Sequence, residues 1–511
     1  MVFCGKPSPA CGSCRQRRIK CDLKKPGCSQ CSNASTICPG YRNVLDLCFR
    51  DESQAVARKV QKKQKHLAVQ SRGKPRTCKS PSPTLDPALV SSDLCTDFAS
   101  FDLASAISKT LTLPIEEIAT SHFFSTYVPD GHFHYLPQLY SDIGPGSSLF
   151  PVVHAVAIAN LSREMRAPEL QAEAQFQYAR ALAATNCALA CPQQAVEDST
   201  LASVLLLSLF ETMTQQYRQM PSSWSSHIEG ATALLKMRGL EQFDSKLGSQ
   251  LYIQVSSSIR ISSAQRCTRV PADFLDFNEM ALPFLDANNP TLRVSLLVDA
   301  FARFREAVAN KNFGDSGFII DTALQLDQSV LMLLSTLPDG CDYEVIHLAK
   351  SEPGVFEGIT HKYRDHRVAQ LWNSLRMIRI FLNEAAHREI SALIGADYES
   401  YGLDVPTEWI LLQEMCARNA QRIASDICAS VPQFTKLSPG QPLAVATAAF
   451  LLWPLSAAGE SYLSPEPLRL YAIDRLKFLG REARLPQALW AAQMLEEHEK
   501  LEDWLHMYHL G

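Results

Sequence analysis

The sequence predicts a mainly α-helical protein in which a small cysteine-rich module precedes a large all-α domain. Six of the 16 cysteines lie close together between Cys11 and Cys38. From about Leu113 to Gly511, apolar residues recur at intervals of three and four, which is the spacing of helices packed on a core. Alternating apolar patterns bounded by Asn-Gly or Asp-Gly turns are missing, so strands are not expected.

Composition divides the chain into four parts. Residues 1–43 hold the cysteine cluster, and residues 44–80 form a basic, partly helical linker. Residues 81–111 contain serine and proline and are expected to form a flexible linker. Residues 112–511 form the helical domain, which is long enough for a real core because 46% of the 511 residues are hydrophobic.

Charge is distributed unevenly along the chain. Residues 1–80 carry 18 Lys and Arg but 4 Asp and Glu. The remainder carries 31 Lys and Arg and 49 Asp and Glu. This asymmetry predicts a polyanion-binding N-terminal part on an acidic body. We find no apolar run near twenty residues long and no secretory leader in the N-terminal residues, so we expect a cytosolic or nuclear protein without a membrane span.

The clustered cysteines repeat one spacing. The pattern CxxC-x6-C occurs twice, first at Cys11, Cys14 and Cys21 and then at Cys28, Cys31 and Cys38. In a reducing compartment such thiols are metal ligands rather than disulfides. Each copy supplies three thiolates, one fewer than the four that Zn²⁺ prefers. Two zinc ions need eight coordination positions, so six thiolates can fill them only if two sulfurs bridge both ions.

The symmetry of the repeat makes Cys11 and Cys28 the natural bridging pair. One zinc ion then takes the first copy plus Cys28, and the other takes the second copy plus Cys11. A segment this short has no hydrophobic core, so its folding free energy must come from the metal. Each CxxC pair is expected to open a short helix, which gives two helix-loop units, with Ser13 and Ser29 available to accept hydrogen bonds from free N–H groups.

The basic residues of the module lie in its first half. The six residues between the second and third cysteines are RQRRIK in the first copy and SNASTI in the second. Because the arginine side chain matches O6 and N7 of guanine in the major groove, we predict that Arg17 and Arg18 read bases. Phosphate contacts are predicted for Arg15, Lys20, Lys24 and Lys25.

The segment CGSCRQRRIKCDLKKPGCSQCSNASTICPGY resembles the fungal-type Zn(2)-Cys(6) binuclear zinc cluster of transcription factors. The likeness includes the basic run before the third cysteine, the Lys-Pro before the fourth and the Pro-Gly-Tyr after the sixth. It implies a nuclear, sequence-specific regulator of RNA polymerase II transcription that binds double-stranded DNA at CGG triplets. Arg17 and Arg18 match the positions of the family's base-contacting pair.

The helical region is similar to the fungal-specific transcription factor domain that accompanies such clusters. The similar stretches are HFFSTYV, SWSSHIEGATALLKMRG, LQLDQSVLMLLSTLP and AQLWNSLRMIRIFLNEAAHRE. The resemblance implies a regulatory role in activation, dimer contacts and, in some family members, responses to small molecules. Transcriptional co-regulators are the partners it implies for this domain.

The basic linker offers weak evidence for a homodimer. Family members often pair through a coiled coil after the cluster, and a heptad frame from Phe49 to Leu67 puts apolar residues at four of six a and d positions. Ser53 and Lys63 interrupt that seam. The lysines of RKVQKKQK suit a nuclear import signal or further phosphate contacts.

Two alternatives to a DNA-binding regulator stay open. The zinc module could be purely structural in a co-regulator or scaffold whose helical domain binds partners. The module could also be a metal store, although storage would not need basic residues on one side of the module. We expect no enzyme, since the chain has no GxSxG, P-loop or GxGxxG motif.

Overall fold

The structure is a computed structural model. It describes residues 10–17, 19–24, 27–36, 38–40, 113–129, 131–144, 146–214, 223–310, 315–348, 352–395, 404–435, 443 and 445–498. Helices dominate these ranges, with one pair of short strands, so the mainly α fold class is confirmed. Both predicted linkers, residues 44–80 and 81–111, lie outside the described residues, and so does the proposed dimer seam.

The cysteine-rich module contains α1 (Gly12–Gln16) and α2 (Ser29–Asn33). The large domain begins with α6 (Ile115–Thr126), α7 (Leu136–Asp142), α8 (Leu149–Met165), α9 (Pro168–Ala190), α10 (Pro192–Ala195) and α11 (Asp198–Thr214). It continues with α12 (Ser223–Arg238), η1 (Leu240–Asp244), α13 (Lys246–Gln265), α14 (Ala272–Ala281), η2 (Leu282–Phe284), α15 (Pro290–Ala309) and α16 (Ser316–Ser335).

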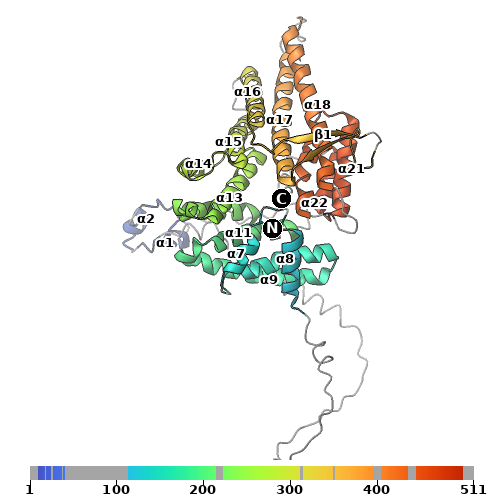
Figure 1. Ribbon diagram of the computed structural model, residues 1–511. Helices are drawn as coiled ribbons and strands as arrows, with labels where there is room; N and C mark the ends of the chain where they lie inside the picture. Colours follow the sequence, from blue (N-terminus) through green and yellow to red (C-terminus); the bar gives the residue numbers. More distant parts are fainter. Residues whose placement is uncertain are drawn as a thin grey trace, which may run out of the picture.

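A hairpin of β1 (Tyr343–His347) and β2 (Ile359–Tyr363) separates α16 from the C-terminal helices. These are α17 (His366–Leu393), α18 (Thr407–Thr435), α19 (Val445–Ala449), α20 (Leu452–Glu460), α21 (Glu466–Glu482) and α22 (Pro486–Glu497). Figure 1 shows α8, α9 and α11 across one end of this body, with the long helices α17 and α18 side by side and α21 and α22 beside them.

Local sequence explains where several helices begin. Helix α17 is capped by Asp365, whose carboxylate accepts a hydrogen bond from the backbone N–H of Val368 at 2.9 Å. Ser245 caps α13 in the same way, with 2.8 Å from its hydroxyl oxygen to the backbone nitrogen of Gly248. Such side chains satisfy N–H groups that have no partner within the helix. Proline occupies the first helical position of α9, α15 and α22, where its missing N–H costs nothing.

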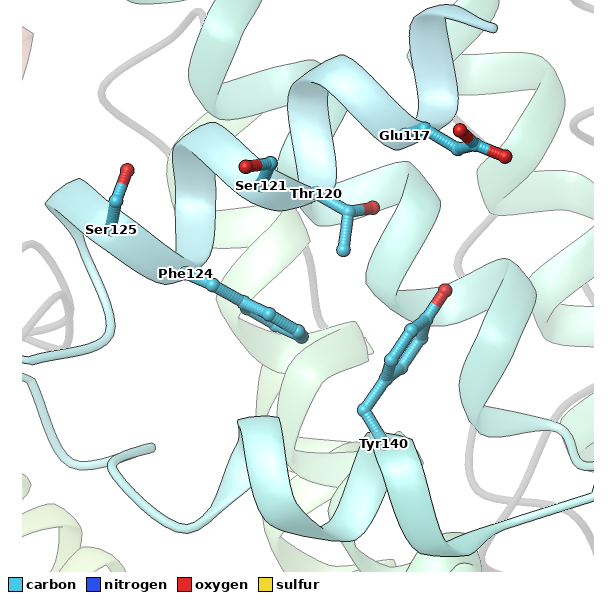
Figure 2. A pocket seen from close by; sticks show the side chains of 6 residues that line it. All are labelled: Glu117, Thr120, Ser121, Phe124, Ser125 and Tyr140. Carbon is cyan, nitrogen blue, oxygen red and sulfur yellow. The ribbon is translucent and has the colours of Figure 1, made fainter. Parts of the chain in front are cut away.

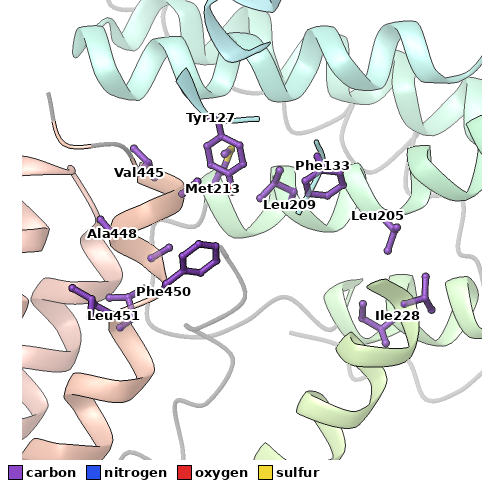
Figure 3. Close-up of a cluster of buried hydrophobic side chains, with 14 of the residues drawn as sticks. Tyr127, Phe133, Leu205, Leu209, Met213, Ile228, Val445, Ala448, Phe450 and Leu451 are labelled. Atoms are coloured by element: carbon purple, nitrogen blue, oxygen red, sulfur yellow. The ribbon is translucent and has the colours of Figure 1, made fainter. Parts of the chain in front are cut away.

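One hydrophobic core joins the two ends of the large domain. Figure 3 shows part of it, where side chains of α11 and the segment after α6 approach α19 and the start of α20. The residues that meet there include Tyr127, Phe133, Leu209, Met213, Val445, Ala448, Phe450 and Leu451. Farther along, Gln487 of α22 donates a hydrogen bond to the carbonyl of Thr212 at 3.1 Å. The C-terminal helices therefore pack on the N-terminal ones in one body.

The β-hairpin was not expected from the sequence. A long connection, residues 348–358, joins its strands instead of an Asn-Gly or Asp-Gly turn, and Gly354 and Gly358 adopt left-handed φ angles of 82° and 70° there. The hairpin is held to α17 by Arg376, which donates to the hydroxyl oxygen of Tyr363 at 2.6 Å and lies 5.0 Å from the ring centroid of Tyr343. Burial raises the pKa of Tyr363 to about 12, so the phenol stays protonated.

Pro432 lies inside α18 without ending it. A proline has no N–H to donate to the carbonyl four residues earlier, here that of Cys428. The hydroxyl of Tyr471 on α21 approaches that carbonyl oxygen at 3.4 Å and donates to the carbonyl of Gly354 at 2.8 Å. A side chain from a neighbouring helix thus takes over part of the missing hydrogen bond and ties α18 to α21.

Among the described helices, α16 is long and apolar enough to cross a membrane by length and composition alone. Its apolar residues do not form one uninterrupted run, because Asp321 and Asp327 lie among them. Asp327 is buried and accepts hydrogen bonds from Nε and Nη2 of Arg379 on α17, at 2.7 and 3.0 Å. This ion pair keeps one face of α16 against α17 inside the protein.

The pair of Asp327 and Arg379 gives a test of this packing. Arg379→Met leaves a carboxylate buried without its cation, which should lower the free energy of unfolding by about 3–5 kcal/mol. Asp327→Leu combined with Arg379→Met should restore most of that loss, as measured by urea unfolding of the full chain. Arg418→Met, which removes an exposed pair with Glu414, should cost less than about 1 kcal/mol. Equal losses in the single and the double variant would contradict the buried pairing.

Candidate metal centre and nucleic-acid interface

The six clustered cysteines form two groups of four in the structure. Sulfur atoms of Cys11, Cys14, Cys21 and Cys28 lie within 4.8 Å of one another. A second group, defined by the same limit, contains Cys11, Cys28, Cys31 and Cys38. Cys11 and Cys28 are therefore the members common to both groups, and each group has the ligand number of a tetrahedral zinc site.

The distances between these sulfurs suit metal coordination. The Sγ atoms of Cys11 and Cys28 are 3.6 Å apart, as are those of Cys14 and Cys28, and those of Cys11 and Cys31 are 3.7 Å apart. A disulfide would need about 2.05 Å. A tetrahedron with Zn–S bonds of about 2.3 Å has edges of about 3.8 Å. The donor set and its spacing therefore fit zinc, and all six thiols are free of disulfides.

The repeat in the sequence is also a repeat in the backbone. The N–H of Ile19 donates to the carbonyl of Cys14 at 3.0 Å, and at the equivalent place in the second copy the N–H of Thr36 donates to the carbonyl of Cys31 at the same distance. Helices α1 and α2 each place one CxxC pair, and both occupy five residues. Helices this short are not stable alone. Four of the cysteines and Ala10 are the buried residues that hold them together.

A left-handed residue closes each half of the module. Leu23 has a φ of 57°, and Gly40, its equivalent in the second copy, has a φ of 84°. Each lies two residues after the last cysteine of its copy, where its backbone donates a hydrogen bond to that cysteine. Glycine adopts this conformation without cost, but a residue with a side chain does not. At this position the first half therefore carries backbone strain that the second half avoids by using glycine.

These backbone hydrogen bonds prepare the outer cysteines for metal binding. Hydrogen bonds from the backbone of Cys28 and Gly40 lower the pKa of the Cys38 thiol to about 7, and the equivalent bonds lower that of Cys21. Burial raises the pKa of Cys28 instead. A bound metal ion deprotonates such a thiol outright. Forming the thiolate therefore costs more at the buried Cys28 than at the outer Cys21 and Cys38.

Asp22 is a structural residue that sequence reasoning missed. Its carboxylate accepts hydrogen bonds from the backbone N–H of Ser29, at 3.1 and 3.3 Å from its two oxygens. Ser29, which the sequence makes available as a cap, here donates its own backbone N–H to Asp22, and the N-cap residue Cys28 makes no side-chain capping hydrogen bond. The hydrogen bonds from Ser29 lower the pKa of Asp22. A negative charge at the start of α2 also interacts favourably with the helix dipole.

The predicted DNA-contacting residues follow α1 or lie in the loop before α2. Arg17 directly follows the last residue of α1, and Arg17, Lys20 and Lys24 are exposed. Arg15 belongs to α1, although its side chain is not described, and Arg18 and Lys25 lie outside the described residues. The described basic side chains therefore lie in the first half of the module, away from the SNASTI segment.

Comparison with known families agrees with this geometry. Residues 9–46 match the family model of the fungal Zn(2)-Cys(6) binuclear cluster domain, and residues 106–289 match that of the fungal specific transcription factor domain. The chain therefore carries a cluster domain and a regulatory domain of the kinds found in fungal transcription factors, which supports a role as a transcription regulator. Both families are those of transcription factors rather than enzymes. No curated protein and no solved structure matched the chain.

The match to the transcription factor domain ends at residue 289, whereas the hydrophobic core of the helical body includes residues beyond it. It covers α6 to α14, and its last residue lies just before α15. Leu209 within the match and Phe450 beyond it belong to the same core cluster. The matched helices therefore bury part of their apolar surface against helices that lie outside the match.

The two left-handed residues of the cluster domain predict opposite effects of two substitutions. Gly40→Ala should lower the stability of the metal-loaded module by about 1 kcal/mol, because alanine resists a positive φ. No atom lies within 4 Å of the added Cβ, so crowding would not contribute. Leu23→Gly should leave that stability unchanged or raise it, since Leu23 is exposed. Competition with a zinc chelator measures the stability of the metal-loaded module in both variants. Equal losses of stability in the two would contradict the strain assigned to Leu23.

Proposed function

We propose that this regulator binds DNA sites built on CGG triplets through its cluster domain and controls RNA polymerase II transcription in the nucleus. The observation that supports the proposal best is the pair of four-sulfur groups sharing Cys11 and Cys28, placed beside a basic segment that only one half of the module carries. A metal store would need the sulfurs but not the charges. The helical body would then be regulated by, or recruit, co-regulators.

In this proposal two zinc ions are held by six cysteines, and Cys11 and Cys28 bridge them. Six thiolates and two divalent ions sum to a charge of −2, and four thiolates per ion satisfy the tetrahedral preference of zinc. The edge lengths of 3.6–3.7 Å between sulfurs support this arrangement. Bound zinc would supply the folding free energy of the module, because its buried residues are almost all cysteines.

The proposed division of labour among basic residues follows their place in the cluster domain. Arg17 and Arg18 would read guanine edges in the major groove, since arginine makes two parallel hydrogen bonds to that base. Arg15, Lys20, Lys24 and Lys25 would contact phosphates, which carry no sequence information. The acidic body would not approach DNA closely, because like charges repel.

A homodimer is a further part of the proposal, with residues 49–67 as the pairing segment. A dimer would place two cluster domains on two half-sites, whose spacing the pairing segment would determine. Sequences selected from a random duplex pool by the full-length protein would show this directly. One triplet in the selected sites would argue for a monomer, and two at a fixed spacing would argue for a dimer.

The metal stoichiometry is the first prediction of this proposal. Native mass spectrometry of the full chain should find two zinc ions. Cys28→Ala should lose both ions, because the bridging thiolate serves both sites. Cys187→Ala removes an exposed cysteine of α9 outside the cluster and should retain both. A wild-type chain that holds a single ion tightly would rule out the bridged arrangement.

The second prediction separates base reading from phosphate contact. In gel-shift titrations against a CGG-containing duplex, Arg17→Ala and Arg18→Ala should each weaken binding by about ten- to a hundredfold and relax the preference at one base. Lys24→Ala should weaken binding to all sequences alike and reduce the slope of affinity against salt by about one unit. If all three variants weakened binding to every sequence alike, the base-reading role of Arg17 and Arg18 would be contradicted. If the wild-type protein preferred no duplex over random competitor, the scaffold hypothesis would be favoured.

A further inference from the structure

The large domain has a hollow between α6 and α7 that the DNA-binding proposal does not use. Its volume is about 500 Å³, and it is open to solvent. Figure 2 shows the side chains that line it, which are Glu117, Thr120, Ser121, Phe124, Ser125 and Tyr140. Five of them come from α6, where Glu117, Thr120 and Phe124 follow the spacing of one helix face.

Two aromatic rings form the apolar part of the hollow. The rings of Phe124 and Tyr140 meet edge to face, with centroids 5.4 Å apart and an angle of 84° between their planes. Tyr140 is fixed further by the ring of Phe150, at 4.7 Å, and by a hydrogen bond of 3.1 Å between its hydroxyl and Nε2 of His154. The rings are therefore held in place, while part of their surface is left exposed.

A buried hydroxyl without a partner faces the same space. Thr120 is 7% exposed, and its Oγ1 atom has no hydrogen-bond partner in the structure. Two other hydroxyls of α6 are satisfied within the helix, since Thr126 and Ser125 both donate to the carbonyl of His122, at 2.8 and 2.9 Å. In Figure 2, the side chain of Tyr140 extends from α7 toward Thr120 on α6, across the hollow. A buried polar group in this state is unfavourable unless something outside the chain bonds to it.

The charge at the rim is negative. Glu117 is exposed at the edge of the hollow, and none of the residues that line it is basic. Burial and the nearby charge of Glu117 raise the pKa of Tyr140, which keeps the phenol protonated. Burial chiefly lowers the pKa of His154, so its ring adds no positive charge at neutral pH. An anionic ligand would therefore be repelled.

We propose that this hollow binds a small organic cation, a primary ammonium carried on an aromatic or alkyl body. The ammonium group would donate hydrogen bonds to the Glu117 carboxylate and to the Thr120 hydroxyl oxygen. The body would lie against Phe124 and Tyr140, whose ring faces also attract a cation. Because the hollow is open to solvent, it would cover one side of such a ligand rather than enclose it. The proposal does not depend on the DNA-binding function.

The probe that tests this is 2-phenylethylammonium, titrated calorimetrically into the full-length protein. It should bind, whereas the neutral analogue 2-phenylethanol and the anionic analogue 3-phenylpropanoate should bind at least about tenfold more weakly, because each lacks the charge-assisted hydrogen bonds. Absence of binding by the ammonium probe, or equal binding by the neutral analogue, would overturn the proposal.

Three variants test the residues. Glu117→Gln should weaken binding of the ammonium probe by about two- to fivefold, because the exposed carboxylate is screened by solvent. The matched control is Glu116→Gln, one residue earlier on α6, where the carboxylate accepts a hydrogen bond from Gln177 at 3.2 Å and does not line the hollow. It should leave the affinity unchanged. Equal effects of the two variants would mean that only the general negative field of α6 attracts the probe, and would overturn the assigned site.

Thr120→Val separates binding from folding. Valine has the same shape as threonine and removes the hydroxyl without a partner, so the melting temperature of the ligand-free protein should stay the same or rise. Binding of the ammonium probe should nevertheless weaken by several fold. Unchanged affinity in this variant would contradict the role of the hydroxyl. Gel-shift titrations of the same variants report the DNA-binding function separately, so failure of one proposal can be told from failure of the other.

Discussion

The N-terminal module depends on one constraint. Its six clustered sulfur atoms must lie close together, because two of them belong to both groups of four. Apart from the cysteines, its hydrophobic cluster contains the buried Ala10 and the partly buried Ile19. Two helices of five residues cannot fold on so little apolar surface. A metal ion that draws four thiolates together replaces the hydrophobic core, and folding and metal binding then become a single equilibrium.

The helical body is stabilised in a different way. Its core consists of apolar side chains from Ala119 to Leu495, and some of the buried charges are paired, such as Arg260 with Asp299 at 2.8 Å. None of this depends on thiolates or on metal. Loss of zinc or oxidation of the clustered thiols would therefore unfold the module without unfolding the body. The two parts of the regulator respond to different conditions because different forces hold them.

The sequence was most informative where the pattern is local. Intervals of three and four identified the helical region, and the cysteine spacing implied the two groups of four that the structure contains. The partners of each helix could not be read from such patterns, because Gln487 and Thr212 meet although they lie in opposite halves of the chain. The hairpin escaped notice because its buried alternation is confined to His361 and Tyr363 around the exposed Lys362.

Within the module, the missed residues are those whose role depends on a backbone conformation. Nothing about an exposed leucine suggests a positive φ, yet the repeat itself held the signal. The residue of the second copy that corresponds to Leu23 is Gly40, and a glycine at one of two equivalent positions indicates that both need a left-handed backbone. Asp22 carried no such signal, since its acceptor role depends on how the two halves meet.

The placement of Asp22 also bears on how the module would approach DNA. It is the single acidic residue between Cys11 and Cys38, and a carboxylate beside a polyanion repels it. Here both carboxylate oxygens accept from the N–H of Ser29 at the start of α2, where the helix dipole compensates part of the charge. The carboxylate thus has a partner within the module, and the exposed basic residues Arg17, Lys20 and Lys24 outnumber it. Since residues 1–80 are basic and the body is acidic, a polyanion is attracted to the N-terminal part of the chain, and the surfaces of the body stay available for other contacts.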